Sequence, residues 1–164
     1  GVLSEASAIC AITNPTVNSY KRINAPVTVS GATWSPNTIS YAGNNRTHMV
    51  RIPDSDRFEF RLPDGAANPY LLPAAVLAAG LHGMEAKLDP GKRMDTNMYQ
   101  QAGGNVKKLP QTLVDALSKL EQSKVLKAGM GDEFIGSYVK LKGLEWQRYL
   151  GQVSPWERDT TLDV

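Results

Sequence analysis

A short run of the sequence alternates charged with apolar side chains: Arg57-Phe58-Glu59-Phe60-Arg61-Leu62. Successive side chains of a β-strand point to opposite faces, so a strand here would carry a cation, anion, cation row opposite a core-facing apolar row. In a cavity, such a row can hold a divalent cation through its carboxylate and polyanionic groups through its guanidinium forks. On an open surface, the same row is a set of exposed ion pairs. The segment alone leaves both interpretations open.

Three further arginines precede this run, at Arg22, Arg46 and Arg51. Arg46 and Arg51 are five positions apart, so in one regular strand they would point to opposite faces. They can reach the same cavity only if Arg46 belongs to the loop before the strand.

The sequence contains no glycine-rich phosphate-binding loop of either common pattern, so a nucleotide would have to be held by arginines and a metal ion. His48 and His82 lack a partner at metal-ligand spacing, and we interpret both as structural. No Ser-His-Asp or Cys-His set is recognisable. The single cysteine, Cys10, lies in an apolar run and is predicted to be buried.

Two short strands, over 46–52 and 56–62, must position the charged row. The turn signal Pro53-Asp54-Ser55 separates them, which predicts an antiparallel hairpin. Upstream, the apolar spacing predicts a helix over 2–13 that ends before Asn14-Pro15. The composition of residues 18–45 favours a long loop with short strands.

Helices are expected to back the hairpin, which makes the fold class α+β. Asn68 and Pro69 suit the start of a helix that is apolar almost all round, and such a helix should be buried on several sides. Residues 88–110 form an irregular connection in this scheme. Amphipathic helices are predicted around 113–120 and 134–139, followed by a polar tail or inter-subunit arm.

Composition restricts the classes of function. The chain has 164 residues, 41% of them hydrophobic, and a net charge of +2, which fits one folded unit and argues against nucleic acid or an acidic membrane as the partner. The longest apolar stretch, 71–81, is shorter than the roughly 20 residues that a membrane span needs. We therefore expect a cytoplasmic protein.

Several segments closely resemble, in order and spacing, the motifs of glutamine synthetases. They are Asn14-Pro15-Thr16-Val17-Asn18-Ser19-Tyr20-Lys21-Arg22, then Asn45-Arg46 with Arg51-Ile52-Pro53, then the charged row running into Pro63-Asp64-Gly65-Ala66-Ala67-Asn68-Pro69-Tyr70. The resemblance continues through 78–83 and 95–99. It implies that residues 1–164 are the C-terminal part of a glutamine synthetase-like catalytic domain, whose N-terminal domain and first part would lie upstream.

The resemblance also implies roles for Glu59 and for the five arginines of these motifs. Glu59 would be a ligand of Mg²⁺ or Mn²⁺, and Arg46 would stabilise charge on the transferred phosphoryl group. Glutamate carboxylates would be bound by Arg22 and Arg61, and the ATP phosphates would face Arg51 and Arg57. Family members assemble into homo-oligomeric rings of the dodecamer type, and this chain alone is not expected to complete the reaction.

The implied function is an ATP-dependent ligase that joins the side-chain carboxylate of L-glutamate to ammonia through a γ-glutamyl phosphate. Phosphorylation of a carboxylate brings two anions together, so metal and guanidinium groups must offset their repulsion. The family's flap carries a glutamate that binds ammonium, but residues 23–36 contain no acidic residue, and Trp34 lies near its place. Because a tryptophan can cover a methylated amine, methylamine is an alternative acceptor. A non-catalytic assembly protein is a second alternative.

Overall fold

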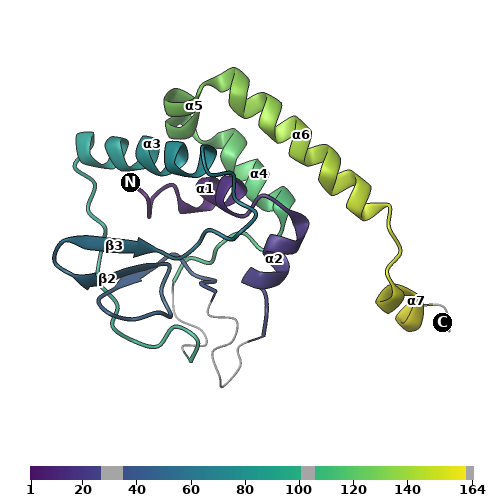
Figure 1. Ribbon diagram of the computed structural model, residues 1–164, viewed down its shortest axis with the longest axis horizontal. Helices are drawn as coiled ribbons and strands as arrows, with labels where there is room; N and C mark the ends of the chain where they lie inside the picture. Colours follow the sequence, from purple (N-terminus) through teal and green to yellow (C-terminus); the bar gives the residue numbers. More distant parts are fainter. Residues whose placement is uncertain (27–34, 101–105, 162–164) are drawn as a thin grey trace.

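The computed structural model describes residues 1–26, 35–100 and 106–161 of the chain (Figure 1). It combines a small three-stranded sheet with helices packed on one another, which confirms the predicted α+β class. The helices are α1 (Ala6–Thr13), α2 (Val17–Ile23), α3 (Leu71–Glu85), α4 (Leu113–Gln122), α5 (Lys124–Met130), α6 (Asp132–Leu150) and α7 (Pro155–Thr161). The strands are β1 (Tyr41–Ala42), β2 (Val50–Asp54) and β3 (Arg57–Phe60).

The core forms around α1, every residue of which is buried. Helix α4 packs its apolar face against α1, and Leu113, Leu117 and Leu120 of that face are all buried. The hydroxyl of Tyr138 on α6 donates to the carbonyl of Ala11 at 2.8 Å, and this hydrogen bond joins α6 to α1. Figure 1 shows α3, α5 and α6 above this centre and the sheet below it.

The predicted hairpin is present, with β2 and β3 antiparallel and Arg51 paired with Glu59. Its turn lies at Ser55 and Asp56, because Pro53 and Asp54 still belong to β2. Strand β1 lies in the segment where short strands were expected, but its parallel pairing with β2 was not predicted from the sequence.

The apolar row of β3 is covered only in part. Leu62 is fully buried and Phe60 half-buried, but Phe58 is 54% exposed. The prediction that this whole row faces the core was therefore wrong at the hairpin end. Phe58 instead lines an apolar groove together with Leu77, Leu81 and Met84 of α3.

Two predictions about helices need correction. The segment expected to be a loop from residue 18 begins with α2, because Thr16 and Ser19 form a capping box that satisfies the free N–H groups of its first turn. Helix α3 is not buried on several sides. Its small residues Ala75, Ala79 and Gly83 are buried, whereas the large apolar side chains of Leu77, Leu81 and Met84 are exposed.

The chain after α4 is more helical than the sequence predicted. Helix α5 begins where the Ser123 hydroxyl accepts from the amide of Leu126. The polar end of the chain contains α7, which is exposed throughout and lies away from the rest of the chain at the end of α6 (Figure 1). No helix among the described residues combines the length and apolar composition of a membrane span.

Candidate active site

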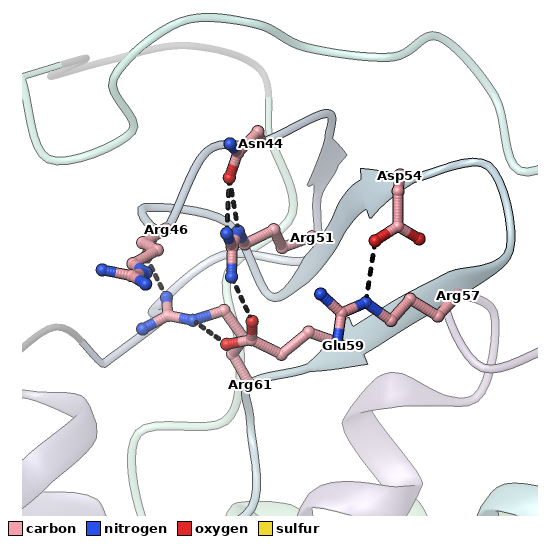
Figure 2. Close-up of polar contacts among 7 residues, drawn as sticks. All are labelled: Asn44, Arg46, Arg51, Asp54, Arg57, Glu59 and Arg61. Atoms are coloured by element: carbon pink, nitrogen blue, oxygen red, sulfur yellow. Dashed lines mark hydrogen bonds and ion pairs between the residues drawn. The ribbon is translucent and has the colours of Figure 1, made fainter.

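Glu59 lies between two arginines from different segments (Figure 2). Arg51 Nη1 of β2 approaches Glu59 Oε2 to 2.5 Å, and Arg61 Nε approaches Glu59 Oε1 at 3.0 Å. Strand pairing produces the first contact, since Arg51 is opposite Glu59 in the register. The second contact is local, since Arg61 directly follows β3 and stands two residues after Glu59. One carboxylate thus holds two guanidinium groups side by side.

The two guanidinium groups are held more firmly than those of ordinary surface arginines. Their side chains are only 14% (Arg51) and 12% (Arg61) exposed, against 44% for Glu59. Asn44 Oδ1 accepts from Arg51 Nε at 2.9 Å and from Arg51 Nη2 at 2.5 Å. Arg61 Nη1 donates to the main-chain carbonyl of Arg46. Arg51, Glu59 and Arg61 therefore form a cluster in which the two guanidinium groups are largely covered and the carboxylate is exposed.

The charges of the cluster keep Glu59 ionised. The hydrogen bond from Arg51 lowers the pKa of the carboxyl group below its ordinary value, and the bond from Arg61 adds to this effect. Glu59 is thus an exposed carboxylate that lies between two guanidinium groups held in place. Such a site favours anions near the guanidinium groups and a hard cation at the carboxylate.

Arg46 lies in the loop before β2, which resolves the parity problem noted in the sequence. Its side chain is exposed and lines a surface cleft of about 650 Å³, together with Arg51, Asn44, Asn45, Thr47 and Asp95. The backbone carbonyl of Arg46 bonds to Arg61, so this loop and the end of β3 are joined directly.

Arg22 reaches the same region from α2. Its Nη2 donates to the carbonyl of Leu62 at 2.6 Å, directly after Arg61 in the chain. Asn14 Nδ2 donates to the same carbonyl at 3.1 Å. Burial raises the pKa of Tyr99, and the charges of Arg61 and Arg22 both act on that phenol in the opposite sense. Arg22 and Arg61 therefore both lie close enough to Tyr99 for their charges to act on its phenol.

Arg57 makes a different contact. Its Nε pairs with Asp54 Oδ2 at 2.9 Å near the hairpin end, and its side chain is 72% exposed. Of the six predicted site residues, the structure brings Arg51, Glu59 and Arg61 together, with the main chain of Arg46 beside them, and leaves Arg57 at the hairpin end (Figure 2). Arg22 lies against the carbonyl of Leu62.

Asn44 and Asp54 are not among the residues predicted from sequence. Asn44 directly precedes the Asn45-Arg46 pair, and nothing in its spacing indicates that it binds Arg51. The sequence pattern marks Asp54 as a turn residue, and its pairing with Arg57 follows only from the register of the hairpin.

The described residues contribute little to a complete metal site. No three His, Cys, Asp or Glu side chains gather into a candidate metal site in the described part of the chain. Glu59 fits a Mg²⁺ or Mn²⁺ ligand by chemistry, since it is ionised and accessible. Trp34 and most of the predicted flap lie outside the described residues.

The fold and the order of these motifs identify the family of the chain. A model of the glutamine synthetase catalytic domain matches residues 1–161, so the chain belongs to the glutamine synthetase family. It is 57% identical to a glutamine synthetase of Rhizobium leguminosarum bv. phaseoli, over 100% of this chain and 38% of that protein. It is 42% identical to a glutamate–methylamine ligase of Methyloversatilis universalis, over 99% of this chain and 38% of that protein.

Solved structures give the same result. A structure of GmaS in complex with ADP has a TM-score of 0.93 and 57% identity, over 99% of this chain and 38% of that one. GmaS without ligand has a TM-score of 0.89 and 51% identity, over 99% of this chain and 37% of that one. The chain thus spans less than two-fifths of the length of these relatives.

Proposed function

We propose that the full-length protein is an ATP- and metal-dependent ligase that forms an amide between the side-chain carboxylate of L-glutamate and ammonia. The observation that carries the proposal is the cluster itself, in which Glu59 is bound on both sides by Arg51 and Arg61 while Arg46 lines the adjoining cleft. Membership of the glutamine synthetase family supports it.

The chemistry requires such a cluster. Transfer of the γ-phosphoryl group of ATP to the glutamate carboxylate brings two anions together and makes a γ-glutamyl phosphate, from which the amine then displaces phosphate. Arg46 and Arg51 would stabilise the charge on the phosphoryl group, and Arg22 and Arg61 would bind and orient glutamate. A Mg²⁺ or Mn²⁺ ion at Glu59 would supply further charge neutralisation.

Arg57 fits the role of an ATP contact in a modified form. It is tethered to Asp54 by one exposed ion pair, which costs little to exchange for a phosphate contact. We therefore propose that Arg57 turns toward the ATP phosphates only when nucleotide binds. Arg51, in contrast, already lies beside the cleft.

The rest of the site would come from outside the described residues. Glu59 is one carboxylate, and the metal ions need additional oxygen or nitrogen ligands. We propose that residues 1–164 are the C-terminal part of the catalytic domain and that this chain alone does not catalyse the reaction. The full-length protein would form a homo-oligomeric ring in the cytoplasm.

Methylamine is a second candidate acceptor. The chain shares 42% identity with a glutamate–methylamine ligase, and residues 23–36 lack any acidic side chain to bind ammonium. A tryptophan near the flap glutamate's place would cover a methyl group by apolar and cation–π contact. Apolar contacts from this tryptophan, with no carboxylate to bind ammonium, would favour methylamine over ammonium.

The test is product formation by the full-length protein with ATP, Mg²⁺ and L-glutamate, supplied with ammonium or methylamine in parallel and analysed by mass spectrometry. The proposal expects glutamine or γ-glutamylmethylamide, and the ratio of kcat/KM values identifies the acceptor. Absence of both amides from a folded, ATP-binding oligomer would reject the ligase function.

A non-catalytic assembly protein makes a different prediction. Glu59→Ala should abolish Mg²⁺-dependent ATP binding if the site is used, whereas Asp54→Ala, on the same hairpin and about equally exposed, should leave that binding within about threefold. Equal Mg²⁺-dependent binding by both variants and the wild type would favour the assembly role.

A further inference from the structure

The loop that carries Arg46 is fastened to a distant segment of the chain. Residues 95–98 run beside residues 43–47, and hydrogen bonds outside any helix or strand join them. They are Gly43 N to Asp95 Oδ1 at 3.5 Å, Asn45 Nδ2 to Thr96 O at 3.1 Å, and Met98 N to Thr47 Oγ1 at 3.0 Å.

His48 adds a further contact between the two segments. Its side chain is fully buried, with Nε2 2.9 Å from the carbonyl of Thr96 and Nδ1 3.0 Å from Ser40 Oγ. A carbonyl oxygen only accepts, so Nε2 must carry the proton, and Nδ1 accepts from the Ser40 hydroxyl in the neutral ring. Burial lowers the pKa of His48, which favours this neutral form.

The position of His48 in the chain connects this contact to the site. It stands two residues after Arg46 and three before Arg51. The carbonyl of the next residue, Met49, accepts from the amide of Arg61 at 2.8 Å, and the carbonyl of Arg46 accepts from the Arg61 side chain. A shift of the His48 ring would therefore move the arginines on both sides of it.

We propose that His48 is a positioning residue of the phosphoryl-transfer site, acting through its Nε2–H bond to Thr96 to hold the loop that presents Arg46. This inference rests on the proposed ligase function. Placement errors of about 1 Å reduce rates on the order of 100-fold, so one buried hydrogen bond that fixes this loop is enough to matter.

A purely structural role predicts a different pattern. If His48 only fills space, any side chain of similar size serves equally, and activity follows the amount of folded protein. If it positions the loop, activity depends on whether the substituted side chain can place an N–H donor where Nε2 of His48 lies. Glutamine can place an N–H near that position, whereas asparagine reaches only as far as Nδ1 and leucine offers no donor.

The experiment compares His48→Gln, His48→Asn and His48→Leu in the full-length protein, with His82→Asn as the matched control. His82 is the second histidine of the chain and lies half-buried on α3. Amide formation gives kcat and the KM for glutamate, and thermal unfolding reports the folded state. Hydrogen exchange of residues 43–47 and 95–98 reports the loop independently of activity.

We expect His48→Gln to keep kcat within about threefold, and His48→Asn and His48→Leu to lower it by roughly 10- to 100-fold. The KM for glutamate should change less than kcat does, because Arg22 is held separately by the Leu62 carbonyl while only Arg61 is bonded to this loop. Faster exchange of both loop segments should accompany the loss, and His82→Asn should match the wild type.

Equal losses in all three His48 variants, or losses that follow the folded fraction, would overturn the positioning role. If the wild type forms no amide, the proposed function fails and hydrogen exchange alone decides on His48. Faster exchange at 43–47 in His48→Asn but not in His48→Gln then supports the fastening, and unchanged exchange in both rejects it.

Discussion

Arg51 and Arg57 carry the same group on paired strands but make very different contacts. Arg51 donates from three nitrogens, to Asn44 at 2.9 and 2.5 Å and to Glu59 at 2.5 Å. Arg57 donates from one nitrogen to Asp54 at 2.9 Å. Substitution of each by lysine keeps the positive charge and removes only the planar fork. The pair of variants therefore isolates the value of the fork.

The expected magnitudes follow from these contacts. A lysine ammonium at position 51 cannot reproduce the three directed contacts, and we count two hydrogen bonds as lost, each worth about 0.5–1.5 kcal/mol. Since Glu59 is 44% exposed, we take the lower part of that range, which gives about 1–2 kcal/mol in total. Arg57→Lys can keep its single exposed pair, so we expect less than about 0.5 kcal/mol.

The assay is thermal unfolding of the full-length variants at one scan rate, followed by circular dichroism. Because full-length relatives are more than twice as long as this chain, we expect a shift of roughly 1–2 °C per kcal/mol, so Arg51→Lys should lower the midpoint by roughly 1–4 °C and Arg57→Lys by less than about 1 °C. Glu59→Gln combined with Arg51→Lys should show less than the sum of the two single effects, since the residues are in contact. Equal midpoints for the two lysine variants would show that the three directed contacts of Arg51 add no stability.

Three further predictions concern the core and the pH dependence. Burial raises the pKa of the Cys10 thiol to about 12, so iodoacetamide at about pH 8 should alkylate it only after unfolding, as read by mass spectrometry. Tyr138→Phe removes the buried donor to the Ala11 carbonyl and should cost about 1–3 kcal/mol of unfolding free energy, while Tyr149→Phe on the exposed side of α6 should cost nothing measurable. The flanking guanidinium groups lower the pKa of Glu59, so its ion pairs contribute fully above about pH 4.3 and are lost as the pH falls through the lowered pKa. The midpoint difference between wild type and Glu59→Gln should thus be constant near neutral pH and vanish in acid; a difference that grows in acid would contradict this.

The charged row is predictable because a strand has a strict period of two. Arg57, Glu59 and Arg61 alternate with apolar residues, and this alternation is enough to place the last two on one face. The partners on other segments are not predictable in this way. Asn44 and the Arg46 carbonyl reach the cluster only through the register of the sheet and the path of a loop.

The failed helix predictions have identifiable physical causes. The sequence does not signal helix α2 because its capping box has Ser19 at the position where glutamate or glutamine is usual. The predicted burial of α3 is too high because an apolar side chain is buried only where another element covers it. Its contacts with α1 and α5 cover the small residues and leave Leu77 and Met84 exposed.

The central claim is that this arginine cluster serves phosphoryl transfer from ATP to the glutamate carboxylate before any amine reacts. Positional isotope exchange tests it most directly, with ATP labelled by ¹⁸O in the β,γ-bridge and the full-length protein incubated with Mg²⁺ and no amine. We expect the label to move from the bridge to the non-bridging β-positions only when L-glutamate is present, and Arg46→Ala to slow the exchange by a factor on the order of 100. Binding of both ATP and glutamate without any exchange of the label would contradict it.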